Sequence, residues 1–235
     1  MFKGSMPALV TPFKDGAVDF GTLEKLVDWH VEQGSHGIVP VGTTGESPTL
    51  SHREHELVIE KVVEFAAGRL PVIAGAGSNN TTEAVRLIRF AEKAGADAVL
   101  LVAPSYNKPP QRGLYLHFKS IADQVSIPCI LYNVPGRTAV NIDAETTIEL
   151  SNVSNIIGVK EAGSNMEQIS SVIKHTGSDF KVWSGNDDET LEIISLGGYG
   201  VVSVSGHLIA NQIKKMITLT LKEERESASK IDKTL

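Results

Sequence analysis

The chain has 235 residues, of which 41% are hydrophobic and 21% are charged, and its 22 basic and 28 acidic residues give a net charge of −6. This composition is typical of a soluble globular protein, and the negative charge disfavours nucleic acid or an anionic membrane as a partner. No apolar run approaches the ~20 residues that span a bilayer, and the N-terminal residues lack the apolar core of a signal peptide. We expect a cytoplasmic protein that acts on small molecules.

Eight short apolar runs, rich in β-branched residues, recur along the chain, and we expect each to form a strand. In chain order they are residues 6–13, 37–41, 71–76, 98–104, 128–134, 155–162, 180–185 and 200–206. The segments between them have the apolar spacing of helices, and three of them end on Gly34, Gly68 and Gly95, as left-handed helix caps do.

This alternation, with one helix after each strand, predicts a parallel sheet buried on both faces. Eight units at roughly thirty-residue spacing favour a closed α/β fold, the (β/α)8 TIM barrel, over an open doubly wound sheet. No linker or change of composition divides the chain. We therefore expect one catalytic barrel over residues 1–222 and a charged C-terminal tail, residues 223–235.

Polar and glycine-rich residues gather where the predicted strands end. The motifs at these ends are "GTTGES" (42–47), "PSYNKP" (104–109), "YNVPGRT" (132–138) and "SGND" (184–187). Barrel enzymes place their chemistry at the C-terminal ends of the strands, so we expect the functional site here.

The sixth predicted strand ends on a lysine. Strand alternation places Ile156, Gly158 and Lys160 on one face and Glu161 on the other. A partly desolvated lysine favours the neutral amine, which can attack a carbonyl carbon to form a Schiff base. The alternative is a solvated lysine at the rim of the sheet.

Other strand ends supply the groups that imine chemistry needs. Tyr132 is either an acid/base group or a packed tyrosine. Thr43 and Thr44 lie in a glycine-containing turn that can hold a carboxylate, although such turns also serve as helix caps. Arg137, predicted in a loop, is either a surface residue or a bidentate partner for a second carboxylate.

Three features predict no further chemistry. Cys129 stands in an apolar run and is expected to be a buried hydrophobe rather than a reactive thiol. His52 and His55 of "HREHE" match no zinc-binding helix and predict a solvated helix face, so we expect no metal and no cofactor. "GAGSNN" (75–80) lacks the third glycine of the dinucleotide fingerprint, which disfavours a nicotinamide-dependent oxidoreductase.

Taken together, "VGTTGES", "PSYNKP", "YNVPGRT", "IIGVKEA" and "WSGND" resemble the motifs of the dihydrodipicolinate synthase family, within the pyruvate-dependent class I aldolases. The resemblance covers residues 2–206, with every motif in order. Sibling aldolases acting on sialic acid or keto-deoxy sugars share the lysine and the tyrosine and are the alternative. The paired threonines and "VPGRT" favour the synthase.

The resemblance implies condensation of pyruvate with L-aspartate 4-semialdehyde, through a lysine Schiff base, in lysine and diaminopimelate biosynthesis. By similarity, Lys160 forms the pyruvate imine, Thr44 holds the pyruvate carboxylate and Arg137 binds the carboxylate of the semialdehyde. The other implied site residues are Tyr132, Thr43 and Tyr106 in a proton relay, and Gly185 and Val202 in the pyruvate pocket.

The resemblance also implies partners. In the family, the tyrosine matching Tyr106 enters the site of a neighbouring subunit, which implies a homodimer or homotetramer. L-Lysine is a candidate inhibitor, although Ser105 stands where lysine-sensitive members usually carry an aromatic residue. The residues that match the lysine effector site are Ser47, His52, His55, Asn79 and Glu83.

The end of the chain departs from the family pattern. Members usually continue after the barrel into further helices, whereas this chain ends in "LKEERESASKIDKTL" (221–235). We expect this tail to be helical and the usual helical extension to be largely absent, so that the tail is the start of a truncated or shortened one. A non-catalytic barrel, a regulator or scaffold, is a further alternative, which the intact set of Lys160, Tyr132 and Arg137 disfavours.

Overall fold

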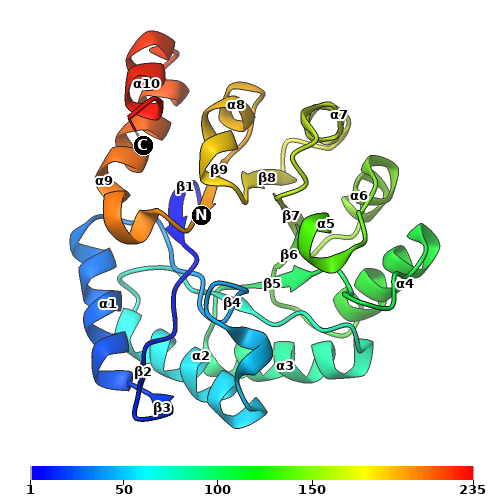
Figure 1. Cartoon of the computed structure of the whole chain (residues 1–235). Coiled ribbons are helices and arrows are strands. Elements are labelled where there is room, and N and C mark those ends of the chain that lie inside the picture. Colours follow the sequence, from blue (N-terminus) through cyan, green and yellow to red (C-terminus); the bar gives the residue numbers. More distant parts are fainter. Residues whose placement is uncertain (1, 235) are drawn as a thin grey trace.

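The computed structural model describes residues 2–234, in which a curved parallel sheet is surrounded by helices (Figure 1). Within these residues seven strands pair in the order β1-β9-β8-β7-β6-β5-β4, so the first strand lies beside the last. The strands are β1 (Gly4–Pro7), β4 (Ile73–Gly75), β5 (Ala98–Val102), β6 (Cys129–Asn133), β7 (Ile156–Glu161), β8 (Lys181–Ser184) and β9 (Gly200–Ser203). The fold is α/β and of the TIM-barrel type.

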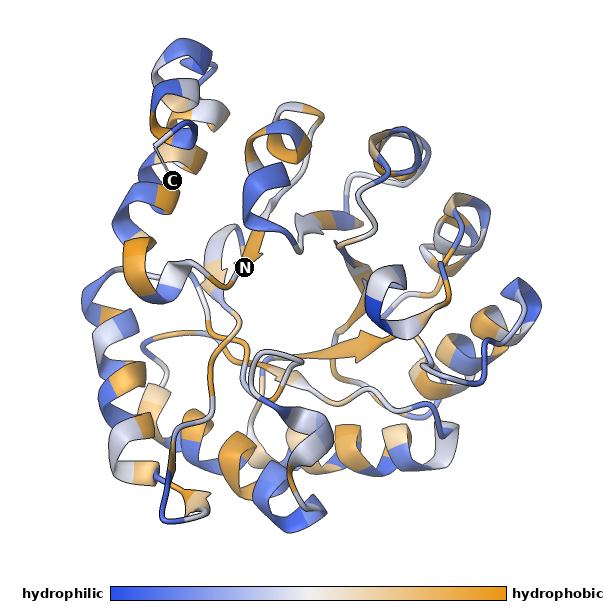
Figure 2. Cartoon of the chain, viewed as in Figure 1, coloured by the Kyte–Doolittle hydropathy of each residue, from blue (hydrophilic) through white to orange (hydrophobic). Residues whose placement is uncertain are grey.

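Amphipathic helices form the outer layer, and Figure 2 shows hydrophobic and hydrophilic residues alternating along them. The long helices are α1 (Phe20–Glu32), α2 (His52–Ala66), α3 (Thr81–Ala94), α4 (Gln111–Ala122), α7 (Met166–His175) and α9 (Gly206–Leu221). The shorter ones are α5 (Pro135–Thr138), α6 (Ala144–Leu150), α8 (Thr190–Ser195), α10 (Arg225–Asp232) and the 3-10 turns η1 (Ser47–Thr49) and η2 (Asp187–Glu189). Among the described residues, none of the helices combines the length and the hydropathy needed to cross a membrane.

The second predicted strand, residues 37–41, forms no continuous strand. It contributes only two isolated parallel bridges, Ala8 with Val39 and Ile38 with Val72, and the Pro40 carbonyl accepts a hydrogen bond from the backbone N–H of Gly75 at 3.0 Å. Pro40 has no N–H to donate to a ladder, and the following Val41 has a left-handed φ of 46°. The prediction of a regular strand here is wrong, yet this segment bonds to both neighbours that an eighth strand would have.

Two further details of the predicted alternation are wrong. The first strand is Gly4–Pro7 rather than residues 6–13, because Phe13 belongs to a small antiparallel hairpin, β2 (Phe13–Lys14) with β3 (Ala17–Val18). One helix per strand also fails, since α5 and α6 both follow β6. The extra turn α5 contains Arg137, which was predicted in a loop.

The glycines predicted to end helices adopt the expected conformation. Gly34, Gly68 and Gly95 have φ angles of 68°, 72° and 93°, in the left-handed region that glycine enters without strain. Cys129 is buried, as predicted, and burial raises the pKa of its thiol to about 12. Its role is to fill space in the layer between sheet and helices.

Two layers of buried side chains flank the sheet. The inner layer joins residues from strands across the ring, among them Met6, Leu100 and Trp183. The outer layer lies between strands and helices and includes Val159 of β7 and Leu23 of α1. Alternate residues of each strand therefore enter different layers, which places the site residues of the inner layer inside the ring.

One irregularity in β7 changes a predicted orientation. The pairing with β6 passes from Ile156 directly to Gly158, which leaves Ile157 without a partner on that strand. Ile156 lies in the outer layer, so the prediction that it shares a face with Lys160 is wrong. An extra residue in one strand reverses the alternation on its far side.

The charged tail contains a helix, as predicted. Helix α10 begins at Arg225, and its Ala228 is fully buried in a small apolar cluster with Ile213 and Ile217 of α9. Figure 1 shows α10 lying beside α9 at one edge of the molecule. The tail is thus packed against the preceding helix.

Candidate active site

Lys160 lies near the C-terminal end of β7 and points into the ring of strands. Only 6% of its surface is exposed, so the predicted alternative of a solvated rim lysine is wrong. It lies opposite Tyr132 of the neighbouring strand β6, and its Nζ lies over the tyrosine ring, 4.2 Å from the centroid. None of the ion pairs formed by residues 2–234 includes Lys160.

Burial lowers the pKa of Lys160, the negative charge of Asp187 opposes that shift and the positive charge of Arg137 adds to it, and the result is a pKa of about 8. An amine with this pKa is partly neutral near physiological pH, which is the form that attacks carbonyl carbons. Gly185 leaves the space that the lysine occupies, because a Cβ at this position would lie 2.9 Å from Cε of Lys160. The structure therefore places Gly185 beside the lysine.

Asp187 is a neighbour of the lysine that the sequence did not single out. Its carboxylate accepts hydrogen bonds from the Ser203 hydroxyl and from the backbone N–H groups of Val204 and Ser205, at 3.0 and 2.9 Å. These bonds join the end of β8 to the end of β9. The signal in the sequence was the "SGND" motif itself, but an aspartate in a strand-end turn is also a common helix cap.

Tyr132 is buried, with 6% of its surface exposed. Burial raises the pKa of its phenol, while interactions with the Thr43 side chain and with Arg137 oppose that shift. Thr43, which is exposed, and Tyr132 both line one cavity, so the structure brings these two residues of the predicted proton relay together. A phenol kept protonated beside an amine can donate and recover a proton.

The turn that holds Thr43 and Thr44 is fixed against the first strand. The Thr11 hydroxyl donates to the carbonyl of Gly45 at 2.6 Å, and a Cβ at Gly45 would lie 2.8 Å from the carbonyl oxygen of Leu9. Thr44 is half-buried within this turn. Only glycine allows such an approach, which explains the "TTGE" pattern.

The remaining predicted residues differ in placement. Val202 is buried in the inner layer of the ring. Arg137 is exposed on α5 and acts on both Lys160 and Tyr132 through its charge. Tyr106, in contrast, is 92% exposed and has a φ of 73°, so a single chain does not bring it to the other relay residues.

The five residues predicted as an effector site come together in one cavity of about 400 Å³. Ser105 also lines it, and the side-chain amide of Asn79 donates to the Ser105 carbonyl at 3.3 Å. Thr43 and Tyr132 also line it, so this cavity extends to two of the candidate catalytic residues. Its predicted effector residues are Ser47, His52, His55, Asn79 and Glu83.

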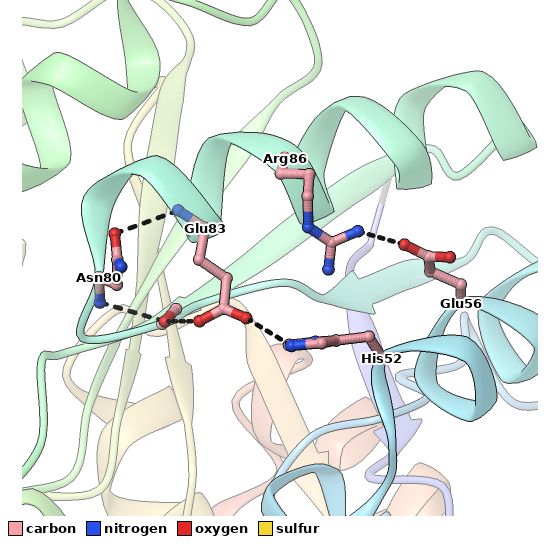
Figure 3. A network of polar contacts seen from close by, with 6 residues as sticks. His52, Glu56, Asn80, Glu83 and Arg86 are labelled. Carbon is pink, nitrogen blue, oxygen red and sulfur yellow. Dashed lines mark hydrogen bonds and ion pairs between the residues drawn. The ribbon is translucent and has the colours of Figure 1, made fainter.

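A network of polar contacts holds one side of this cavity (Figure 3). His52 lies 3.3 Å from the Glu83 carboxylate, which also accepts a hydrogen bond from the Ser78 hydroxyl at 2.9 Å. Arg86 pairs with Glu56 behind it and so ties α3 to α2. Glu83 is thereby held at the wall of the cavity.

His55 corrects the prediction of a solvated helix face. Its side chain is 5% exposed, burial lowers its pKa to about 4, and its Nδ1 has no hydrogen-bond partner among the described residues. The imidazole is therefore neutral, and the residue lines the cavity while its Nδ1 is buried. Among residues 2–234, no group of three or more His, Cys, Asp or Glu side chains is arranged to hold a metal ion.

The fold and the site together define a barrel-type α/β enzyme built around a buried lysine. The model of the Dihydrodipicolinate synthetase family matches residues 1–235. The chain belongs to this family.

The chain is 50% identical to the 4-hydroxy-tetrahydrodipicolinate synthase of Roseobacter denitrificans, over all of this chain and 81% of that protein. It superposes on the dihydrodipicolinate synthase of Aquifex aeolicus with a TM-score of 0.98 and 48% identity, covering 100% of this chain and 80% of the other. The enzyme of Cyanidioschyzon merolae, solved with lysine bound, gives a TM-score of 0.96 at 44% identity and covers 98% and 80%. These names favour the synthase over the sibling aldolases.

Proposed function

We propose that the chain catalyses the condensation of pyruvate with L-aspartate 4-semialdehyde, the reaction of the 4-hydroxy-tetrahydrodipicolinate synthases. The observation that carries this proposal is the buried amine of Lys160, whose pKa is lowered to about 8, beside the ring of Tyr132. A binding module has no use for an amine kept partly neutral by desolvation.

The reaction begins with Lys160. Its neutral amine attacks the keto carbon of pyruvate, and the carbinolamine loses water to give a protonated imine. Loss of a methyl proton then gives an enamine, whose carbon attacks the aldehyde carbon of the second substrate and forms the new carbon–carbon bond. The positive imine nitrogen serves as the electron sink, so this step requires no metal.

The surrounding residues bind substrate and move protons. Tyr132 and Thr43 exchange protons with the carbinolamine and the growing alkoxide, and Tyr106 completes the relay from a second copy of the chain, which requires a homodimer or a homotetramer. The exposed guanidinium of Arg137 receives the carboxylate of the semialdehyde. The pyruvate-binding residues in this proposal are Thr44, Gly185 and Val202.

We infer that residues 37–41 complete a closed eight-stranded barrel, because they bond to both β1 and β4 segments. In this view residues 1–222 are the catalytic barrel and residues 223–235 are a charged tail that follows it. By analogy with the activity of the relatives, we assign the reaction to lysine and diaminopimelate biosynthesis in the cytoplasm.

Borohydride reduction in the presence of pyruvate tests the chemistry. The expected result is a trapped pyruvate mass on the peptide that contains Lys160, and no trapping in Lys160→Ala. Turnover with aspartate semialdehyde, compared with sugar-derived aldehydes, tests the acceptor. Trapping on another lysine, or faster turnover with the sugar aldehydes, would contradict the proposal.

L-Lysine is proposed as an effector that binds in the cavity of Ser47, His52, His55, Asn79 and Glu83. The observation that favours it is the Glu83 carboxylate at the cavity wall, which can receive an ammonium group. Ser105 supplies no aromatic contact, so we expect weak inhibition. Calorimetry with L-lysine, compared between the protein and Glu83→Gln, tests binding, and a flat activity curve across millimolar lysine would contradict inhibition.

A further inference from the structure

Two buried polar residues stand directly behind the catalytic lysine and tyrosine. Asn133 and Glu161 pair across β6 and β7, one residue beyond the pair of Tyr132 and Lys160. Because strand side chains alternate, Asn133 and Glu161 face the helices while the catalytic pair faces the ring. Both are 0% exposed. Glutamate is seldom fully buried without a charged partner, so its position calls for a physical reason.

The two side chains bond to each other. The side-chain N–H groups of Asn133 donate to both carboxylate oxygens of Glu161, at 3.2 and 3.1 Å, and to Oδ1 of Asn141 at 2.8 Å. Gln168 of α7 approaches the same carboxylate at 3.4 Å. A hydrogen bond from an amide to a buried carboxylate is stronger than a neutral one and restrains the strands that carry both groups.

The same network also holds the segment that carries Arg137. Oδ1 of Asn133 accepts a hydrogen bond from the backbone N–H of Ile142 at 3.0 Å, and the neighbouring Asn141 bonds to Asn133 and to Gln168. The chain therefore leaves β6 at Asn133, forms α5, and returns to the same side chain nine residues later. Asn133 therefore helps to fix the position of α5 relative to β6, together with Gln111 and Gln168, which also bond to residues 141–143.

Every partner of the Glu161 carboxylate is a hydrogen-bond donor. These donors are the amides of Asn133 and Gln168 and the backbone of Gly163. Burial raises the pKa of Glu161, the hydrogen bonds from Asn133 and Gln168 oppose this shift and the negative charge of Glu189 adds to it, so that the pKa is about 7. Among residues 2–234, no cation is among the groups that shift the pKa of Glu161, and the other acids near the network are Glu189 and Asp143, which accepts a hydrogen bond from Asn141. Protonation replaces an acceptor by a donor and breaks part of the network.

We propose that Asn133 and Glu161 are positioning residues for the reaction, which hold Lys160 against Tyr132 and fix the segment of Arg137, and that they do so only while Glu161 is ionised. The inference rests on the proposed function, since it concerns the geometry of the same site. Misplacement of a catalytic group by about 1 Å costs on the order of a hundredfold in rate.

The test uses Glu161→Gln, which keeps the shape of the side chain and removes its charge, in the full chain. We expect kcat to fall about 10- to 100-fold while the KM for pyruvate changes little, because the lost interaction acts on the geometry of the reacting groups. Asn155→Leu is the matched control. Its amide donates to the carbonyls of Ala122 and Val125 at the opposite end of β7, at 3.0 and 3.1 Å. The control should lower the melting temperature and leave kcat unchanged.

The pH profile separates positioning from a merely structural role. In the wild type, kcat/KM for pyruvate requires neutral Lys160 and ionised Glu161, so its logarithm should rise with a slope near two below about pH 7. In Glu161→Gln the slope should be about one, since only the lysine titrates. Asn155→Leu should keep the wild-type slope.

Three outcomes decide the matter. An unchanged slope and an unchanged kcat in Glu161→Gln overturn the positioning role, as does a loss of kcat equal to that of Asn155→Leu at equal melting temperature. Should Glu161→Gln fail to fold, Gln168→Leu removes one donor to the carboxylate, and it must shift the acid limb of the profile to higher pH. A wild-type protein that traps no pyruvate on Lys160 overturns the proposed function instead.

Discussion

Two regions of the molecule carry charged side chains and compensate them differently. In the β6–β7 wall, defined as Tyr132, Asn133, Lys160 and Glu161, the lysine and the glutamate are buried and neither forms an ion pair among the described residues. In the α2–α3 rim, defined as His52, Glu56, Glu83 and Arg86, each group has a charged or titratable partner. In the wall, the lysine is buried and has no ion-pair partner within residues 2–234, so its pKa is lowered and its amine is reactive. In the rim, the ion pairs hold together the two helices that line the cavity.

Replacing Lys160 by methionine should have the largest effect. We expect loss of turnover by about four orders of magnitude or more, because no other group can form the imine. The free energy of unfolding at pH 7 should at the same time rise by about 1–3 kcal/mol, because the buried ammonium group is removed. Chemical denaturation measures the second effect, and a destabilised variant would show that the lysine is not under desolvation strain.

Replacing Tyr132 by phenylalanine keeps the ring beside the lysine and removes the proton donor. We expect kcat to fall about 100- to 1,000-fold, the range of a general acid–base group. Borohydride trapping of pyruvate should still occur, more slowly, since the amine is intact. If kcat is unchanged, the phenol has no part in proton transfer.

The pH dependence of the free energy of unfolding tests the buried carboxylate of the β6–β7 wall. The pKa of Glu161 is raised from 4.5 to about 7, so the folded chain binds its proton more tightly than the unfolded chain does. Its contribution to stability is therefore full below pH 4.5 and is lost as the pH rises through 7. Relative to Glu161→Gln, the wild type should lose about 2–3 kcal/mol across this range. Urea unfolding at several pH values measures the difference, and parallel curves would contradict the burial of an ionised carboxylate.

Changes in the rim should have the smallest effects. His52→Ala removes a contact with Glu83 in which the histidine side chain is 72% exposed. Exposed pairs contribute about 0–1 kcal/mol, so we expect a small change in the free energy of unfolding and an unchanged kcat. The response to added L-lysine is where this variant should differ. A large loss of activity would show that rim and wall are coupled.

Much of the site was predictable because parallel strands end at one edge. The spacing of apolar runs identified seven of the observed strands, and Tyr132 and Lys160, near the ends of two neighbouring ones, lie opposite each other. The family resemblance added Gly185 and Val202, which lie beside the lysine and in the inner layer, and their role in a pyruvate pocket stays a prediction.

Other features were not predictable from local pattern. A single unpaired residue, Ile157, reverses the face of Ile156, and nothing in the letters "NIIGVKEA" marks a bulge. Residues 37–41 read as a strand, although Pro40 and the left-handed Val41 prevent a continuous ladder. Asp187 met Ser203 only because β8 and β9 are neighbours.

The sequence by itself determined the class of fold and the candidate nucleophile, because hydrophobic period and strand-end polarity are local properties of the chain. Tertiary structure alone decided that Lys160 is dry, since it lies in β7 while its charged neighbours, Arg137 and Asp187, follow β6 and β8, and these strands meet only after folding. The same is true of Asn133 and Glu161, which are 28 residues apart in sequence and bonded across β6 and β7. Reactivity here depends on burial, and burial is a property of the assembled sheet.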